Sequence, residues 1–397
     1  RQRNKPGPAG IADALFGLWK DHHVPIEPFT IAVPDDVIED LRQRLGRTKF
    51  AARATDGDTW AGGTDPEYLR ELVTYWRDGF DWRAAETALN ELPHYVAVAG
   101  GRRVHFVWLR SGKPGALALI MTHGWPGSFL EMVAAARLLA GEFDVVVPSL
   151  PGFLFSEPIA DLFTRRIVAE VWHELMTGVL GYERFGAYGS DIGGGVTTWL
   201  GALFPGEVVG VHLATSIAGG DLKNPPLTAQ EQDFFRRREA YDLQDGGYSE
   251  IMCTRPDTVA AALLDSPAGL AAWIVDKYRA WSDCDGDLER RWDKDTILTV
   301  LTMYWATASI GTSFRQYYDY ETHNTPVPVI NVPAAVTLSS EPGYAGFPRS
   351  LAERLFSDLR HWNTPGRGGH FIAHEEPQLI AAELSGFFGS LRRSPGD

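Results

Sequence analysis

Cysteine is nearly absent from this 397-residue chain, which has only Cys253 and Cys284 and therefore no basis for a disulfide framework. No run of about 18 apolar residues occurs, so no membrane-spanning helix is expected. Positive charge is also scarce, because 37 Lys and Arg face 51 Asp and Glu, a net charge of -14 that argues against a nucleic-acid partner. We expect a protein of the cytoplasm without a membrane partner.

Two further kinds of feature are missing. The first 24 residues lack the apolar stretch of a signal peptide and read as a flexible leader. The run "DHH" at 21–23 has no metal-ligand spacing and no supporting cysteine or carboxylate pair, so no metal site is expected.

The residues that are present predict an α/β protein. Short apolar runs alternate with helix-like stretches after residue 95, and they include "VHFVWLR", "ALALIMTHG", "FDVVVPSLPG", "RFGAYGSD", "VVGVHLAT" and "VPAAVTLSS". Continuous apolar runs of this length are typical of buried parallel strands. We therefore predict a mostly parallel central sheet with helices on both faces.

The sequence divides into five segments. Residues 25–95 are aromatic-rich and mostly helical, with a helix expected after "PDD" because Val37, Ile38, Leu41 and Leu45 follow helical spacing. Residues 221–325 are helical, polar and rich in Tyr and Trp, which predicts a cap over the carboxyl edge of the sheet. The segments are 1–24 (leader), 25–95 (N-terminal accessory segment), 96–220 (first half of the core), 221–325 (cap) and 326–397 (second half of the core).

The glycine-rich stretch "GAYGSDIGGG" at 186–195 predicts a sharp turn between a strand and a helix. A nucleophile at such a turn needs small residues two positions before it and two after it. Ser190 has Tyr188 and Ile192 at those positions, whereas Asp191 has glycines. The pattern therefore favours Asp191 as the exposed residue, although a turn containing Asp and Gly is usually only a turn.

A second motif, "THGWPGS" at 122–128, follows an apolar strand directly. Its Gly and Pro can turn the backbone so that the N–H of Trp125 points at the site. Together with the N–H of Ile192, this amide would form an oxyanion hole. The alternative is a plain strand-to-helix connection with a packing Trp.

A base and an acid are expected near the C-terminus. His370 lies in the glycine-flanked loop "RGGHF", a better context than that of His361 or His374. Glu341 comes directly after the strand "VPAAVTLSS" and is the candidate that orients the imidazole of His370. The competing acids are Asp319, Glu321 and Asp358.

Together these stretches resemble the microsomal-type epoxide hydrolases, which have the α/β-hydrolase fold. The resemblance covers about residues 25 to 390 and lies in "PFTIAVPDDVIEDLRQRL", "WRAAETALNELPHY", "HGWPGS", "GSDIGG", "GYSEIMCTRPDT", "DSPAGLAAWIVDK" and "GGHFIAHEEP". It implies Asp191 as nucleophile, His370 as base and Glu341 as supporting acid. Tyr248 and Tyr317 would polarise the epoxide oxygen.

The same resemblance implies further details of the site and its reaction. Trp125 and Ile192 would supply the oxyanion-hole amides, and Trp125 and Tyr318 are substrate-binding candidates. Ile192 stands where the family usually has an aromatic residue. The region "SSEPGYAGFPRS" differs in length from the family pattern, and we expect no membrane anchor of the kind that the microsomal members have. The expected reactants are a hydrophobic epoxide, with aryl epoxides as candidates, and water, without a cofactor; a homodimer is a further expectation.

Two other functions fit parts of the pattern. A haloalkane or haloacid dehalogenase shares the Asp nucleophile and the His, but it needs halide-stabilising donors, whereas the paired cap tyrosines favour an epoxide. A non-catalytic ligand-binding homologue usually loses a member of the catalytic set, and every member has an occupant here. A serine esterase fails the spacing test at the turn.

Overall fold

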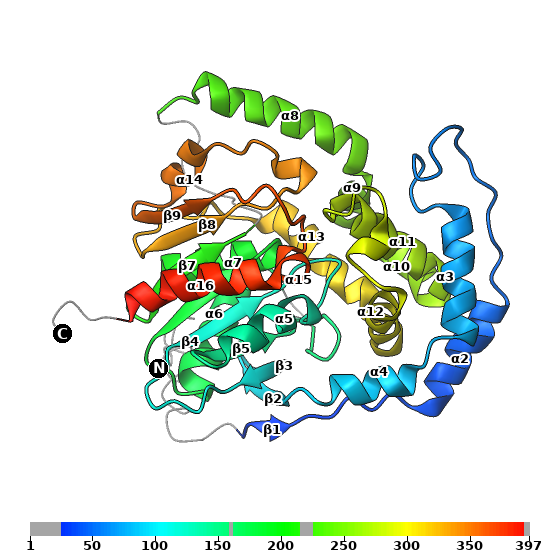
Figure 1. Cartoon of the computed structure of the whole chain (residues 1–397), viewed down its shortest axis with the longest axis horizontal. Coiled ribbons are helices and arrows are strands. Elements are labelled where there is room, and N and C mark those ends of the chain that lie inside the picture. Colours follow the sequence, from blue (N-terminus) through cyan, green and yellow to red (C-terminus); the bar gives the residue numbers. More distant parts are fainter. Residues whose placement is uncertain (1–24, 159–161, 215–224, 393–397) are drawn as a thin grey trace, which may run out of the picture.

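A β-sheet with helices on both faces forms the centre of the protein (Figure 1). The computed structural model describes residues 25–158, 162–214 and 225–392, and within them nine strands form one sheet in the order β1-β2-β3-β5-β4-β6-β7-β8-β9. The strands are β1 (Glu27–Pro28), β2 (His94–Ala99), β3 (Arg102–Leu109), β4 (Ala118–Thr122), β5 (Asp144–Pro148), β6 (Phe185–Gly189), β7 (Val208–Leu213), β8 (Ala334–Thr337) and β9 (Leu359–Asn363).

Five of the eight strand pairings, from β5 to β9, are parallel. The first three pairings, β1 with β2, β2 with β3 and β3 with β5, are antiparallel. Gly100 and Gly101 join β2 to β3 with φ values of 57° and 71°, the left-handed region that suits glycine and allows a tight hairpin. The predicted mostly parallel sheet is confirmed, with a hairpin added at one edge.

Two pairs of helices cover the sheet. α5 (Leu130–Leu139) packs with α16 (Pro377–Leu391) on one face, and α6 (Arg165–His173) packs with α7 (Ile192–Leu203) on the other (Figure 1). Every residue of β4, β6 and β7 is buried. Cover on both faces explains why these strands read as continuous apolar runs. β9 is a half-exposed edge strand that contains charged and polar residues, so its sequence shows no continuous apolar run.

The cap is an insertion between β7 and β8, and it lies at one end of the sheet (Figure 1). Its described part, from residue 225 on, is helical as predicted. The helices are α8 (Ala229–Asp245), α9 (Gly247–Thr254), α10 (Pro256–Asp265), α11 (Pro267–Trp281), η2 (Leu288–Arg290), α12 (Lys294–Thr307) and α13 (Ile310–His323).

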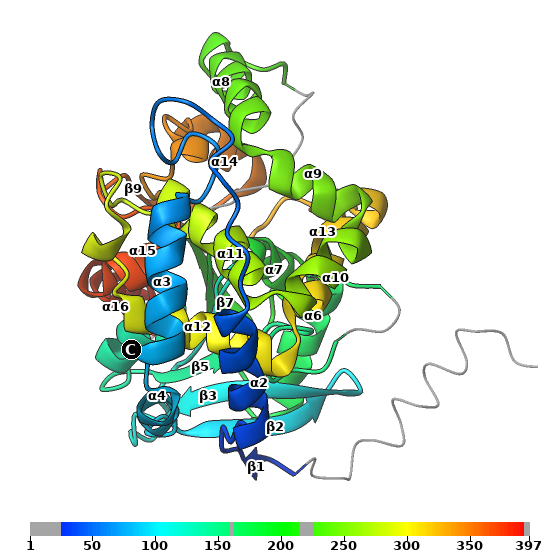
Figure 2. The ribbon, with the colours of Figure 1, turned by 90° about the vertical axis from the view of Figure 1, so that its right-hand side faces the viewer.

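The N-terminal segment packs its helices against the cap and adds the strand β1 to the edge of the sheet (Figure 2). It contains α2 (Asp35–Gly46), α3 (Pro66–Asp78) and α4 (Trp82–Leu89). α2 begins at the expected "PDD" and buries Ile38, Leu41 and Leu45, three of the four residues with helical spacing. α2 and α3 both contact α11. The remaining short elements are η1 (Glu174–Val179), η3 (Pro342–Tyr344), α14 (Arg349–Leu355) and α15 (Ile372–Glu375).

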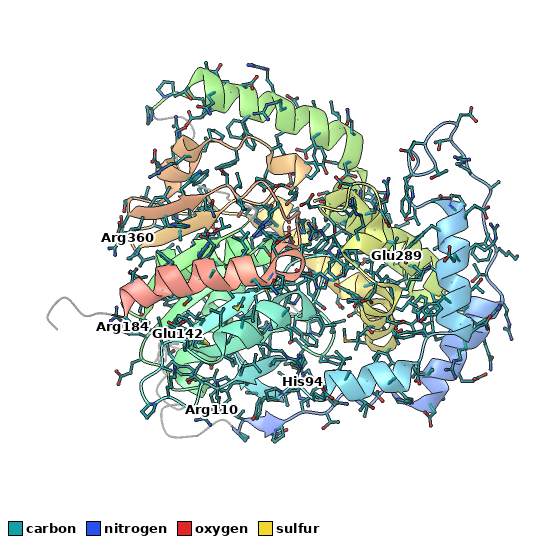
Figure 3. The ribbon with its side chains drawn as sticks, viewed as in Figure 1. His94, Arg110, Glu142, Arg184, Glu289 and Arg360 are labelled. Carbon is teal, nitrogen blue, oxygen red and sulfur yellow. The ribbon has the colours of Figure 1, made fainter. Side chains whose placement is uncertain are left out.

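The end of the sheet opposite the cap carries the charged residues Arg110, Glu142, Arg184 and Arg360 (Figure 3). The other end, where the parallel strands finish, faces the cap. Among the described residues no single helix is long and apolar enough to cross a bilayer, and only two sharply bent helix pairs in the cap meet the length and composition test.

Candidate active site

The turn between β6 and α7 presents Asp191. This residue has φ 52° and ψ −123°, a conformation that costs energy for any residue other than glycine. A Cβ on Gly189 would lie 2.1 Å from the carbonyl oxygen of Gly193, and a Cβ on Gly193 would lie 2.0 Å from that of Thr122. Only glycine fits at these two positions. They lie two residues before and two residues after Asp191, whereas Ser190 has larger residues at the corresponding positions.

The loop after β4 brings a backbone donor to this turn. The N–H of Trp125 donates to Oδ1 of Asp191 at 2.8 Å. A Cβ on Gly124 would lie 2.3 Å from the same oxygen, so a glycine here lets the loop come close. Ile192 is the first residue of α7, where backbone N–H groups have no partner within the helix. The structure thus places both predicted oxyanion-hole residues next to Asp191.

His370 and Glu341 form a buried pair. Nδ1 of His370 lies 2.9 Å from Oε2 of Glu341, and the two residues are only 5% and 7% exposed. Burial alone would lower the pKa of His370, but the charge and hydrogen bond of Glu341, with the charges of Asp191 and Glu131, raise it to about 9. In the neutral ring, Nδ1–H donates to Glu341 and Nε2 can accept a proton.

Glu375 holds the loop that carries His370. Its carboxylate accepts backbone N–H groups from Gly369 (3.0 Å), Phe371 (3.1 Å) and Asp283 (2.7 Å). The backbone N–H of His370 itself donates to a carbonyl oxygen of α11 at 2.8 Å. Nothing in the stretch "GGHFIAHEEP" distinguishes Glu375 from its neighbours, because its partners are backbone amides on two separate segments.

Of the competing acids, Glu321 is exposed, and Asp319 and Asp358 have other partners, as do the histidines His361 and His374. Asp319 accepts from the N–H of Phe163 at 2.7 Å and from Nε of Arg315 at 2.6 Å. Asp358 pairs with Arg360, His361 pairs with Glu383, and His374 contacts the carbonyl oxygen of Arg291.

Aromatic side chains of the cap surround Trp125. The ring of Tyr248, on α9, stacks on the indole at 5.3 Å with an interplanar angle of 5°. Tyr317, on α13, meets the indole edge-on at 5.8 Å and lies 6.1 Å from the ring of Tyr248. Burial and the nearby charge of Asp191 hold the pKa of both phenols well above the ordinary value, so both stay protonated and can donate hydrogen bonds.

Known proteins resemble this chain over nearly its whole length. The family model described as "Epoxide hydrolase N terminus" matches residues 26–132, and the one described as "alpha/beta hydrolase fold" matches residues 118–244. A Stigmatella aurantiaca protein whose name contains "epoxide hydrolase" is 38% identical over 92% of this chain and 86% of its own length. Epoxide hydrolase 1 of Sus scrofa is 32% identical, over 93% and 89%. This chain belongs to the microsomal-type epoxide hydrolases.

Solved epoxide hydrolases share its architecture. Juvenile hormone epoxide hydrolase from the silkworm Bombyx mori is similar with a TM-score of 0.82 and 27% identity, covering 97% of both chains. The epoxide hydrolase of Aspergillus niger is similar with a TM-score of 0.82 and 28% identity, covering 93% of this chain and 97% of its own. The predicted α/β-hydrolase fold and enzyme class are both confirmed.

A further buried acid in this epoxide hydrolase was not expected from sequence. Glu131, on α5, is 4% exposed, and its Oε1 accepts the N–H of Ser128 at 3.1 Å. Burial is the main cause that raises its pKa to about 8. The hydroxyl of Tyr304 donates to the carbonyl oxygen of Gly127 at 2.8 Å, so the loop after β4 is held from two sides.

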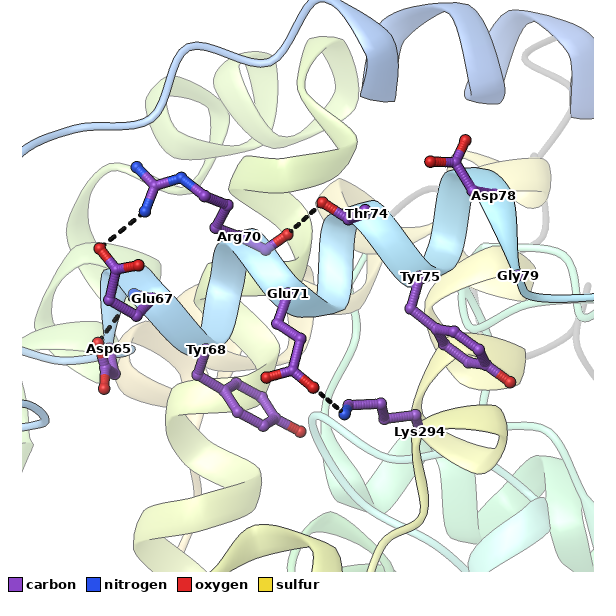
Figure 4. Close-up of a pocket in the computed structure, with 10 residues that line it drawn as sticks. All are labelled: Asp65, Glu67, Tyr68, Arg70, Glu71, Thr74, Tyr75, Asp78, Gly79 and Lys294. Atoms are coloured by element: carbon purple, nitrogen blue, oxygen red, sulfur yellow. Dashed lines mark hydrogen bonds and ion pairs between the residues drawn. The ribbon is translucent and has the colours of Figure 1, made fainter.

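Not every expected residue reaches the site. Tyr318 is 39% exposed, whereas Tyr317 beside it packs on Trp125. A surface groove along α3, which Lys294 borders, lies on the outer side of the N-terminal segment and holds none of the predicted site residues (Figure 4). Within the described ranges, no group of three or more His, Cys, Asp or Glu side chains could hold a metal ion.

Proposed function

We propose that this enzyme converts a hydrophobic epoxide and water into a vicinal diol through an ester on Asp191. The observation that carries the proposal is the bond from the Trp125 amide to Oδ1 of Asp191, beside a buried His370–Glu341 pair. A held Oδ1 orients the carboxylate, and Tyr248 and Tyr317 pack on the same Trp125. The aromatic surroundings favour an apolar substrate, with aryl epoxides as candidates.

In the first step, Oδ2 of Asp191 attacks one epoxide carbon and the bond from that carbon to the ring oxygen breaks. The electron pair goes to the epoxide oxygen, which accepts hydrogen bonds from Tyr248 and Tyr317 and takes the proton that His370 carries. A carboxylate suits this step because the ester it forms keeps a carbonyl that water can attack. A serine would leave an ether, which water does not readily cleave.

In the second step, His370 takes a proton from water and the hydroxide attacks Cγ of Asp191. The negative charge on Oδ1 is stabilised by the N–H groups of Trp125 and Ile192. The ester bond then breaks, and the oxygen that leaves takes the proton that His370 removed from water. One oxygen of the water remains in Asp191, whose carboxyl group returns its proton to His370. The reactants are the epoxide and water alone; the cytoplasmic location, the homodimer and the segment boundaries stay predictions.

The dehalogenase alternative uses the same nucleophile but produces a halide ion. Tyr248 and Tyr317 offer two adjacent hydroxyl donors, which suit an epoxide oxygen that stays bonded to the substrate. Membership of the epoxide hydrolase family supports the same choice.

The test compares the two residues at the turn with styrene oxide as substrate. Asp191→Asn should lower diol formation about 1,000-fold or more, because the amide is a poor nucleophile. Ser190→Ala should stay within about threefold of the unmodified enzyme. A single turnover in ¹⁸O-water should place the label in Asp191, as seen by peptide mass. Loss of diol in Ser190→Ala with full activity in Asp191→Asn would contradict the proposal.

A further inference from the structure

Lys277, on α11, is a buried lysine next to the proposed site. It is 5% exposed, and lysine is almost never buried to this degree without a partner. Its Nζ lies 2.5 Å from Oδ1 of Asp245 and 3.0 Å from Oδ2 of Asp276. Desolvating an ammonium and a carboxylate is costly even when they pair, so the pair needs an explanation beyond stability.

The ammonium of Lys277 also lies against the proposed acid. Its Nζ is 4.9 Å from the ring centroid of Tyr248 and 5.6 Å from that of Trp281. These distances are within the range of cation–π attraction. The Tyr248 ring is therefore in contact with an ammonium and with the stacked indole of Trp125.

Asp245 connects the pair to the rest of the site. Its Oδ2 accepts the indole N–H of Trp281 at 2.7 Å and the hydroxyl of Tyr241 at 3.0 Å. The ring of Trp281 packs 5.1 Å from Tyr248 and 4.8 Å from His370. One carboxylate thus fixes an indole that touches residues of both reaction steps.

The charges explain why Asp245 needs a cation beside it. Burial is the main cause that raises the pKa of Tyr248, and the negative charges of Asp191, Glu341 and Asp245 raise it further, while Arg238 lowers it. Without Lys277, Asp245 would keep an uncompensated negative charge near the phenol. A weaker acid gives a weaker hydrogen bond to a developing alkoxide.

We infer that Lys277, through its ion pair with Asp245, is a positioning residue that holds the ring of Tyr248 and compensates the carboxylate beside it during ring opening. This inference rests on the proposed function, because it assigns Tyr248 to the epoxide oxygen. Lys277 lies against Tyr248 and acts on the first step, whereas it reaches His370 only through Asp245 and Trp281, so ester hydrolysis depends on it much less.

The experiment measures the two steps separately by stopped-flow Trp fluorescence with styrene oxide. In Lys277→Met the rate of ester formation should fall about tenfold, the size expected for losing one cation–π contact and its charge. Ester hydrolysis should stay within twofold, and Lys277→Arg should recover ester formation to within threefold. The matched control is Lys294→Met, which should change neither rate. Lys294 begins α12, and its Nζ lies 2.5 Å from Oε1 of Glu71 on α3 (Figure 4).

The inference is wrong if Lys277→Met forms the ester within twofold of the unmodified enzyme, slows both steps equally, or is not rescued by Lys277→Arg. If Lys277→Met does not fold, the double variant Lys277→Met/Asp245→Asn replaces it, and ester formation within twofold of normal would overturn the inference. Binding of phenylacetamide, whose carbonyl accepts hydrogen bonds without reacting, should also weaken about tenfold in Lys277→Met. If the unmodified enzyme forms no diol, the proposed function is refuted. The binding measurement still tests the role of Lys277 in that case, because it needs no reaction.

Discussion

At the scale of single residues, the charge of His370 is the quantity on which the second step of the proposed reaction depends. With a pKa raised to about 9, its ring carries a proton at neutral pH, and an imidazolium cannot take another proton from water. Ester formation on Asp191 removes one of the negative charges that raise this pKa. The ring can then release its proton to the alkoxide formed in the first step and become a base when water must be activated.

The variant Asp191→Asn mimics this loss of charge and should lower the pKa of His370. Glu341→Gln should lower it more, because it removes a charge and a hydrogen bond. Imidazole NMR titrations between pH 5 and 10 measure both shifts. Since the folded pKa exceeds the unfolded value of about 6.5, His370 contributes stability below pH 6.5 that is lost as the pH rises through about 9. A pKa that stays near 9 in Asp191→Asn would refute the mechanism.

The sequence predicted those residues whose roles follow from local spacing. Asp191 is recognisable because the glycines two positions on either side are required by sterics at the turn. Glu341 is recognisable by its place after the strand β8. Glu375 and Lys277 are not, because their partners are backbone amides or rings that only the folded chain brings together.

At the scale of secondary-structure elements, two buried histidines join the hairpin strands β2 and β3 to the loop after β5. Nδ1 of His94 lies 2.9 Å from Nε2 of His105, and Nδ1 of His105 lies 2.9 Å from Oγ of Ser149. Nε2 of His94 (labelled in Figure 3) lies 2.8 Å from the carbonyl oxygen of Leu89, the last residue of α4. These contacts can form a continuous chain when both rings are neutral or when one is protonated, but protonation of both rings would place two N–H groups face to face.

Acid should therefore weaken the fold through this histidine pair. Burial lowers the pKa of His94, and burial with the charges of His94 and Arg103 lowers that of His105 further. A depressed folded pKa gives stability that is present above pH 6.5 and is lost as the pH falls toward the folded values. His105→Gln should lower the unfolding free energy at pH 8 by about 1–3 kcal/mol and reduce its slope between pH 6.5 and 4.5.

Urea unfolding at a series of pH values measures this slope. The matched control is His323→Gln, since His323 lies exposed at the end of α13 and its replacement should leave the slope unchanged. An unaltered slope in His105→Gln would show that the buried pair does not set the acid sensitivity.

At the scale of the whole molecule, the N-terminal segment and the cap behave as one packed unit. The indole N–H of Trp76, on α3, donates to Oγ1 of Thr302, on α12, at 2.9 Å, and Trp76 is 2% exposed. Thr64 donates to the carbonyl oxygen of Ala272 at 2.7 Å, and Arg44 pairs with an aspartate of α10. The cap carries Tyr248 and Tyr317, so the segment at one end of the sequence supports residues of the proposed site.

Trp76→Phe should test this coupling, because it keeps most of the buried ring and leaves the hydroxyl of Thr302 without a donor. We expect a loss of about 1–2 kcal/mol in the free energy of unfolding, and a smaller loss in Trp76→Phe/Thr302→Val than the two single changes predict together. Amide exchange in α12 should rise in Trp76→Phe as much as in α3. Thr74→Ala, on the exposed side of the same helix, should change stability by less than about 0.5 kcal/mol. Faster exchange confined to α3 would mean that the N-terminal segment unfolds independently and that the cap holds its tyrosines unaided.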